Sequence, residues 1–84
     1  MSESLDTWKA LATRTLDVRP DLARGDEPFV RIMEAAEATR PGEILAVIAP
    51  FEPVPLYNVL AERGFTHETR KIAADEWIVH FQSG

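Results

Sequence analysis

The chain has 84 residues, 45% of them hydrophobic and 27% charged, and its formal net charge is −5. This length suits a single domain, no apolar run approaches the roughly 18 residues of a membrane span, and the absence of cysteine excludes disulfides, thiolate metal sites and a cysteine nucleophile. Negative charge opposes contact with phosphate backbones and anionic lipid, so we expect neither nucleic acid nor a membrane as a partner. The N-terminus lacks the pattern of a signal peptide, which favours a cytoplasmic protein of bacterial type.

The first predicted element is a short helix in an N-terminal helical extension, residues 1–13. Ser4 is suited to cap this helix, and Trp8 and Leu11 lie on its apolar stripe. Because an isolated helix of this length is marginal in water, we expect it to form only where Trp8 and Leu11 cover another surface.

Residues 14–84 form the predicted domain, which begins with a strand. In residues 13–19 apolar side chains alternate with polar ones, the pattern of a half-buried strand. Pro20 lacks a donor for the strand ladder and is expected to end the strand. Residues 21–25 are then predicted to form a loop.

The first long helix is expected to follow this loop. Asp26 can cap it, and Glu27 and Pro28 suit its first turn, where a carboxylate complements the helix dipole. Pro41 and Gly42 are expected to end the helix. Its apolar stripe lies at Phe29, Ile32, Met33 and Ala36.

The remaining residues predict a strand, a second helix and a hairpin. Residues 43–49 are almost continuously apolar, which suits a central strand. The second helix is expected to end before Gly64, a typical residue after a helix C-terminus. Residues 65–72 and 76–82 are predicted to form two hairpin strands around residues 73–75.

The resulting order, β-α-β-α-β-β, predicts an α+β fold. We expect a two-layer α/β sandwich with a four-stranded mixed sheet and both long helices on one face. The open face would carry Val47 or Leu45 together with Ile78 and His80. We expect the N-terminal helix, a second copy of the chain in a homodimer, or a protein partner to cover that face.

Several of these segments carry a family resemblance. They are the strand residues Leu16, Asp17 and Arg19, the helix start at Gly25, Asp26, Glu27 and Pro28, and the turn at Pro41, Gly42 and Glu43. This pattern resembles the TusA/SirA sulfur-carrier family, in which a strand leads into a Cys-Pro-x-Pro helix start. The chain is more similar still to an uncharacterised family of TusA-like domains that lacks the cysteine, through its segments at 53–57 and 76–79.

The departures from the sulfur carriers decide what the resemblance implies. Gly25 stands where the carriers have their cysteine, so transfer of a persulfide is not expected. The resemblance therefore implies a small non-enzymatic interaction or accessory domain, with a protein partner and no cofactor. Members of the cysteine-less family often occur fused to or near hemerythrin-like and nitrogen-oxide respiration proteins. The alternative function is therefore a small-ligand or metal-binding domain in redox or nitrogen-oxide metabolism.

The candidate docking surface combines the start of the first long helix with the neighbouring loop before the second. Its arginines suit an anion or partner at a helix N-terminus, although Asp26 and Glu27 already supply the negative charge that this end favours. No nucleophile has an obvious base, and we expect no enzyme. The residues of this surface are Arg19, Arg24, Asp26, Glu27, Pro28, Arg31, Glu52, Pro53, Pro55 and Tyr57.

His67 and His80 are weak candidates for metal ligands. A two-residue turn at Ala73 and Ala74 would place them directly opposite each other on paired strands, close enough to share a metal ion. A three-residue turn would place them on opposite faces. The more ordinary interpretation is two unconnected histidines at or near the surface, and no metal site is predicted.

Overall fold

The computed structural model describes residues 4–84, so residues 1–3 of the predicted N-terminal extension lie outside the described residues. Its elements follow the predicted order, with one additional short helix. In chain order they are α1 (Leu5–Ala10), β1 (Arg14–Asp17), α2 (Arg19–Ala23), α3 (Phe29–Ala38), β2 (Ile44–Ala49), α4 (Val54–Ala61), β3 (Phe65–Ala73) and β4 (Glu76–Ser83). None of these helices is long and apolar enough to cross a lipid bilayer.

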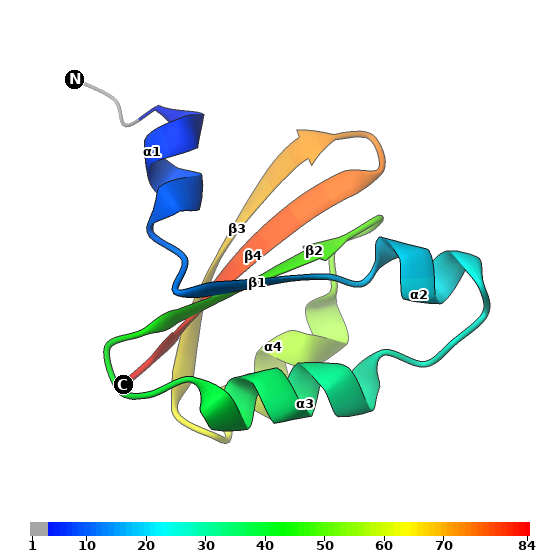
Figure 1. Ribbon diagram of the computed structural model, residues 1–84. Coiled ribbons are helices and arrows are strands. Elements are labelled where there is room, and N and C mark those ends of the chain that lie inside the picture. Colours follow the sequence, from blue (N-terminus) through cyan, green and yellow to red (C-terminus); the bar gives the residue numbers. More distant parts are fainter. Residues whose placement is uncertain (1–3) are drawn as a thin grey trace.

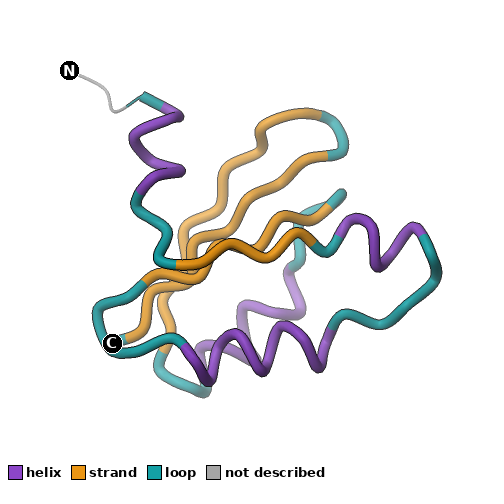
Figure 2. Tube along the Cα trace, in the orientation of Figure 1, coloured by secondary structure: helices purple, strands orange, loops and turns teal. Residues whose placement is uncertain are grey.

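The four strands form one mixed sheet in the order β1-β2-β4-β3. β1 runs parallel to β2, whereas β4 pairs antiparallel with both β2 and β3. Figure 1 shows α3 and α4 below the sheet and α1 on its opposite side, and the tube in Figure 2 shows the same layers. The predicted α+β fold with a four-stranded mixed sheet is confirmed.

The main core lies between the sheet and the two helices α3 and α4. Its members include Leu45, Val47, Val79 and Phe81 from the sheet and Ile32, Met33, Ala36 and Leu60 from the helices. The three α3 residues are spaced one and three positions apart, so they lie on one side of that helix. This side faces the sheet. Phe29, the first residue of the predicted α3 stripe, is the exception and stays 42% exposed.

The opposite face of the sheet is covered in part by α1, through Trp8. The Trp8 side chain is 1% exposed and packs against residues of β2 and β4. Its ring stacks on that of His80 with 3.7 Å between the centroids, and the Arg70 guanidinium lies 4.4 Å from the Trp8 centroid. Trp8 is the one buried residue of α1, and Leu11, directly after the helix, is 49% exposed.

The prediction for this second face was wrong at β2. Leu45 and Val47, one of which was expected on the open face, both lie in the main core. β2 is apolar on both sides, so its sequence pattern does not fix which side faces the long helices. The pairing with β4 fixes it, because Leu45 lies opposite Phe81 and Ala46 lies opposite His80.

The segment after β1 also differs from the prediction. β1 ends at Asp17, and residues 19–23 form α2 where the end of the strand and a loop were expected. Pro20 is compatible with this helix, because its fixed φ suits the first turn and its missing N–H removes no hydrogen bond that the helix needs.

The start of α3 lies later than predicted. The helix begins at Phe29 with Pro28 as the residue before it, so Asp26 does not cap it. The Glu27 carboxylate instead accepts a hydrogen bond from the backbone N–H of Phe29 at 2.9 Å. This bond satisfies one of the donors that a helix N-terminus leaves unpaired.

The β3–β4 hairpin places the two histidines on opposite faces. His67 lies opposite Phe81, on the side of α4, whereas His80 lies on the side of α1. The turn residues are 74–75, one position later than the turn that would pair the histidines, and with the irregularity between Lys71 and Ala73 it is Glu68 that lies opposite His80. His67 and His80 therefore cannot share a metal ion.

Candidate functional site

An apolar groove of about 350 Å³ opens where β1 and β2 end and α3 and α4 begin. Because β1 and β2 are parallel, their carboxyl ends meet at one edge of the sheet, a common position for ligand sites in open α/β sheets. The floor is formed by Val18, Val47 and Ala49, all of them buried. One wall is the start of α3, and the other is the segment of residues 51–56 that leads into α4.

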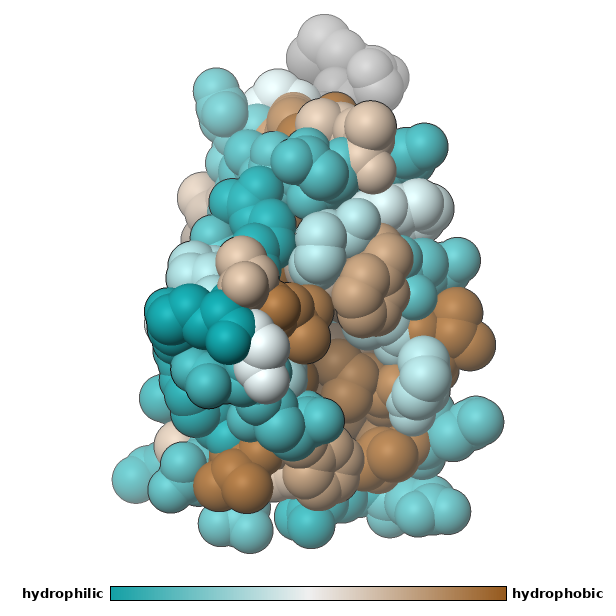
Figure 3. Space-filling view, turned by 90° about the vertical axis from the view of Figure 1, so that its right-hand side faces the viewer, coloured by the Kyte–Doolittle hydropathy of each residue, from teal (hydrophilic) through white to brown (hydrophobic). Residues whose placement is uncertain are grey.

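Two aromatic side chains flank the groove and remain in contact with water. Phe29 is 42% exposed and Phe51 is 53% exposed. Figure 3 views the side of the molecule that carries α2 and the start of α3, and hydrophobic side chains gather in its lower half. Single exposed apolar residues are ordinary, whereas apolar side chains gathered around a hollow are typical of a binding surface.

Prolines fix both walls of the groove. Pro28 immediately precedes α3 and Pro53 immediately precedes α4, each with a φ angle of −83°. Pro55 lies in the first turn of α4. Because a proline ring holds φ near this value, these walls have little conformational freedom to lose when a partner binds.

Gly25 directs the chain from α2 toward α3. Its φ angle is +78°, in the left-handed region that residues with a Cβ rarely adopt. A Cβ added at this position would meet no atom within 4 Å, so the backbone conformation and not a lack of space favours glycine.

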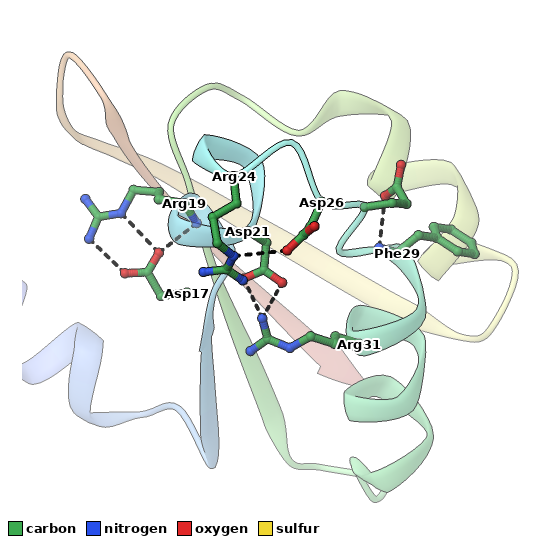
Figure 4. A network of polar contacts seen from close by, with 8 residues as sticks. Asp17, Arg19, Asp21, Arg24, Asp26, Phe29 and Arg31 are labelled. Atoms are coloured by element: carbon green, nitrogen blue, oxygen red, sulfur yellow. Dashed lines mark hydrogen bonds and ion pairs between the residues drawn. The ribbon is translucent and has the colours of Figure 1, made fainter.

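Beside the groove, Asp21 joins α2 to α3 (Figure 4). Its side chain is only 6% exposed, and both of its carboxylate oxygens accept hydrogen bonds from Arg31. Arg24 lies 3.9 Å from Asp21 and 3.0 Å from Asp26. The hydrogen bonds from Arg31 hold the pKa of Asp21 below its ordinary value. These arginines are therefore already neutralised by carboxylates of the same chain.

Arg19 is paired in the same way, at the end of β1. Its guanidinium lies 2.9 Å from the Asp17 carboxylate, which also accepts a hydrogen bond from the backbone N–H of Arg19. The side-chain hydrogen bond lowers the pKa of Asp17. Glu76 lies 3.9 Å from the same guanidinium. An external anion would have to compete with these carboxylates for Arg19.

Of the described residues that line the groove, Glu27 is the one that carries a charge. Figure 4 shows that the adjoining wall residue, Phe29, lies on the opposite side of the start of α3 from Arg24 and Arg31. The ion pairs and the groove therefore occupy different sides of this helix start.

Tyr57 and Glu52 belong to the contact between α4 and β3. The Tyr57 hydroxyl donates to Glu52 at 3.0 Å and lies within hydrogen-bond distance of the Thr69 hydroxyl. Its ring stacks on that of His67 with 3.8 Å between the centroids. Burial raises the pKa of Tyr57. The Glu52 side chain is thus held toward β3.

The structure divides the predicted docking surface into three groups. Glu27, Pro28, Pro53 and Pro55 line the groove, Arg19, Arg24, Asp26 and Arg31 form ion pairs beside it, and Glu52 and Tyr57 join α4 to β3. Sequence reasoning missed the two aromatic walls. Phe51 does carry a signal, because it is an aromatic residue in a proline-spaced loop outside any stripe. Phe29 carries none, because its place on a stripe predicts burial.

Within residues 4–84, no three His, Asp or Glu side chains come together closely enough to hold a metal ion. The groove instead offers a preformed apolar surface with one carboxylate at its edge. Such a surface can bind an apolar group by removing it from water.

No curated protein and no solved structure gives a significant match to this chain. One family, DUF2249, described as an uncharacterized conserved protein, matches residues 15–83. The match extends from β1 to the last residue of β4, so it includes the floor and both walls of the groove and leaves out α1. The chain belongs to the DUF2249 family of uncharacterized conserved proteins.

Proposed function

We propose that this protein is a non-enzymatic interaction module of the bacterial cytoplasm, and that the apolar groove between α3 and α4 is its docking site. The observation that carries the proposal is the pair of half-exposed rings, Phe29 and Phe51, beside a floor of fully buried residues. Burying apolar surface in such a groove contributes roughly 25 cal/mol for each Å² removed from water.

The lining of the groove supports docking over catalysis. Among the described lining residues, only Glu27 carries a group that could transfer a proton, and its carboxylate already holds the Phe29 N–H. General acid–base or nucleophilic catalysis needs a second functional group within hydrogen-bond reach. The groove offers shape and apolar surface instead.

The proposal includes a TusA-like origin for the domain. Gly25 occupies the position that the resemblance assigns to the carrier cysteine, and its φ angle of +78° suits glycine. A member without the cysteine would keep the helix start but not the carrier chemistry. The groove beside that helix start would then serve as the contact surface.

A second candidate function is the binding of a small apolar ligand. The groove volume of about 350 Å³ lies at the lower end of the roughly 300–1,000 Å³ typical of small-molecule sites. A metal-binding form of this candidate has less support, because His67 and His80 lie on opposite faces of the sheet.

Affinity capture from the native cell extract, compared between variants, tests the docking site. We expect the double variant Phe29→Ser and Phe51→Ser to lose a partner that the wild-type protein retains. Leu11→Ser is the matched control, because Leu11 is 49% exposed and directly follows α1, which lies across the sheet from the groove. Equal capture by all three proteins would refute the groove as the docking site.

Native mass spectrometry of the same purified protein separates the two candidates. A bound small molecule that the double variant lacks would favour the ligand-binding function. A protein partner captured without any bound molecule would favour the interaction module.

A further inference from the structure

We propose that the partner's docking segment is a peptide that presents one apolar side chain with a lysine or arginine beside it. This inference rests on the proposed docking function and adds the chemistry of the partner. The apolar side chain would fill the groove, and the basic side chain would pair with Glu27 at its edge.

The charges around the groove favour a basic partner. Among residues 4–84, Glu27 is the one charged residue that lines the groove, and no lysine or arginine of that range lines it. Arg24 and Arg31, on the opposite side of the α3 start, are paired with Asp26 and Asp21. The formal charge that an incoming segment meets at the described groove lining is therefore the Glu27 carboxylate, and a basic group complements it.

The Glu27 carboxylate is placed so that it can pair with a basic side chain of the partner. Its Oε1 atom accepts the hydrogen bond from the Phe29 N–H at 2.9 Å. Within residues 4–84 its Oε2 atom has no hydrogen bond or ion pair, so this oxygen is free to accept one from a cation. Because Phe29 is itself a groove wall, the bond holds the carboxylate next to the apolar surface before any partner arrives.

The composition of the groove favours a peptide over other partners. Its floor has no polar side chain that could orient a small polar ligand, whereas a peptide brings an apolar anchor and a charge on one backbone. The net charge of −5 opposes nucleic acid and anionic lipid. A second copy of the chain would bring that same net charge and the same acidic edge.

A peptide titration followed by amide NMR of the full chain tests this inference. Three short capped peptides of equal length carry a central tryptophan flanked by lysines, glutamines or glutamates. We expect the lysine peptide to shift the amide signals of Phe29, Phe51 and their neighbours. It should bind roughly two- to fivefold more tightly than the glutamine peptide, the effect of one solvent-accessible ion pair, and the glutamate peptide should bind most weakly. Added salt should reduce this preference.

Two variants assign the preference to Glu27. Glu27→Gln keeps an oxygen that can accept the Phe29 N–H but removes the charge, so it should abolish the preference for lysine and leave the glutamine peptide unaffected. Glu62→Gln is the matched control, because Glu62 is an exposed glutamate beyond the last residue of α4 that does not line the groove.

The outcomes separate this inference from the function on which it rests. Equal binding of all three peptides, with groove signals shifted and no effect of salt or of Glu27→Gln, would overturn the basic partner and leave the docking groove in place. If no peptide shifts the groove signals, both the docking function and the partner chemistry fail. Groove signals that move on dilution of the protein alone would identify a second copy as the occupant and overturn the peptide.

Discussion

Replacing Trp8 with alanine tests whether a single side chain holds α1 to the sheet. Trp8 is 1% exposed and stacks on His80, whereas Leu11, at the end of the same helix, is 49% exposed. α1 has 6 residues and is too short to be stable without this contact. We therefore expect Trp8→Ala to release α1 from the sheet.

The expected loss in the free energy of unfolding is about 3–5 kcal/mol, the range for truncation of a large buried aromatic residue. A buried tryptophan removes roughly 150–250 Å² from water, which at about 25 cal/mol per Å² gives an upper limit of roughly 4–6 kcal/mol. The conformational freedom that α1 regains on release reduces this figure. A domain of this length has roughly 4–13 kcal/mol of stability in total, so the loss is large.

Urea unfolding monitored by far-UV circular dichroism measures this loss, because that signal does not depend on the number of tryptophans. Leu11→Ala is the control and should change stability by less than about 1 kcal/mol, because its side chain is half exposed. Deletion of residues 1–12 should give the same stability as Trp8→Ala, because both remove the contact of α1 with the sheet. The claim that Trp8 by itself holds α1 to the sheet would be refuted by either of two results. Trp8→Ala could be as stable as the wild type, or it could be far more stable than the protein that lacks residues 1–12.

Three further predictions concern the loop and the hydrogen bonds around the site. Gly25→Ala should lower stability by about 1–2 kcal/mol and Gly25→Asn by less, because asparagine tolerates positive φ; equal losses in chemical unfolding would contradict this. Asp21→Asn should lower the melting temperature at neutral pH, because Arg31 loses its charged partner. The pKa of Asp21 in the folded protein lies below its ordinary 3.8, so its contribution is present above that pH and is lost as the pH falls through the lowered value. The melting curves of wild type and Asp21→Asn should therefore converge on acidification, and a gap independent of pH would be evidence against the ion pair. Tyr57→Phe should cost about 0.5–1.5 kcal/mol in wild type but less in a Thr69→Val background, and fully additive losses would argue against the bond between the two hydroxyls.

The order of the elements could be predicted because most of the chain has one clear periodicity. In β4, Ile78 and His80 alternate strictly with Val79 and Phe81, and each pair lies on the face that the alternation predicts. In β2 the sequence is apolar at every position, so no pattern showed that Leu45 faces the long helices. That information lies in the pairing with β4, which only the folded sheet provides.

The sequence predicts where the candidate site lies, but not which residues line it. The two helix starts and their prolines are visible in the sequence, and Pro28 and Pro53 do line the groove. The sequence predicts arginines that a partner could bind, because it does not show that α2 places Asp21 against Arg31. The groove itself depends on Phe29 and Phe51, which are distant in the sequence and come to line one groove only at the ends of two parallel strands.

The strand order also determines which part of the molecule opens most easily. β3 and β4 are joined by a two-residue turn, whereas β1 reaches β2 only after α2 and α3. Because contacts between distant segments carry a larger loop-closure cost, we expect the hairpin to form early in folding and the four-residue β1, at the edge of the sheet, to join last. The backbone N–H of Val18, on the groove floor, bonds to Ile48 at the end of this β1–β2 ladder. Its amide should therefore exchange with solvent faster than those of β4, and a partner bound in the groove should slow that exchange.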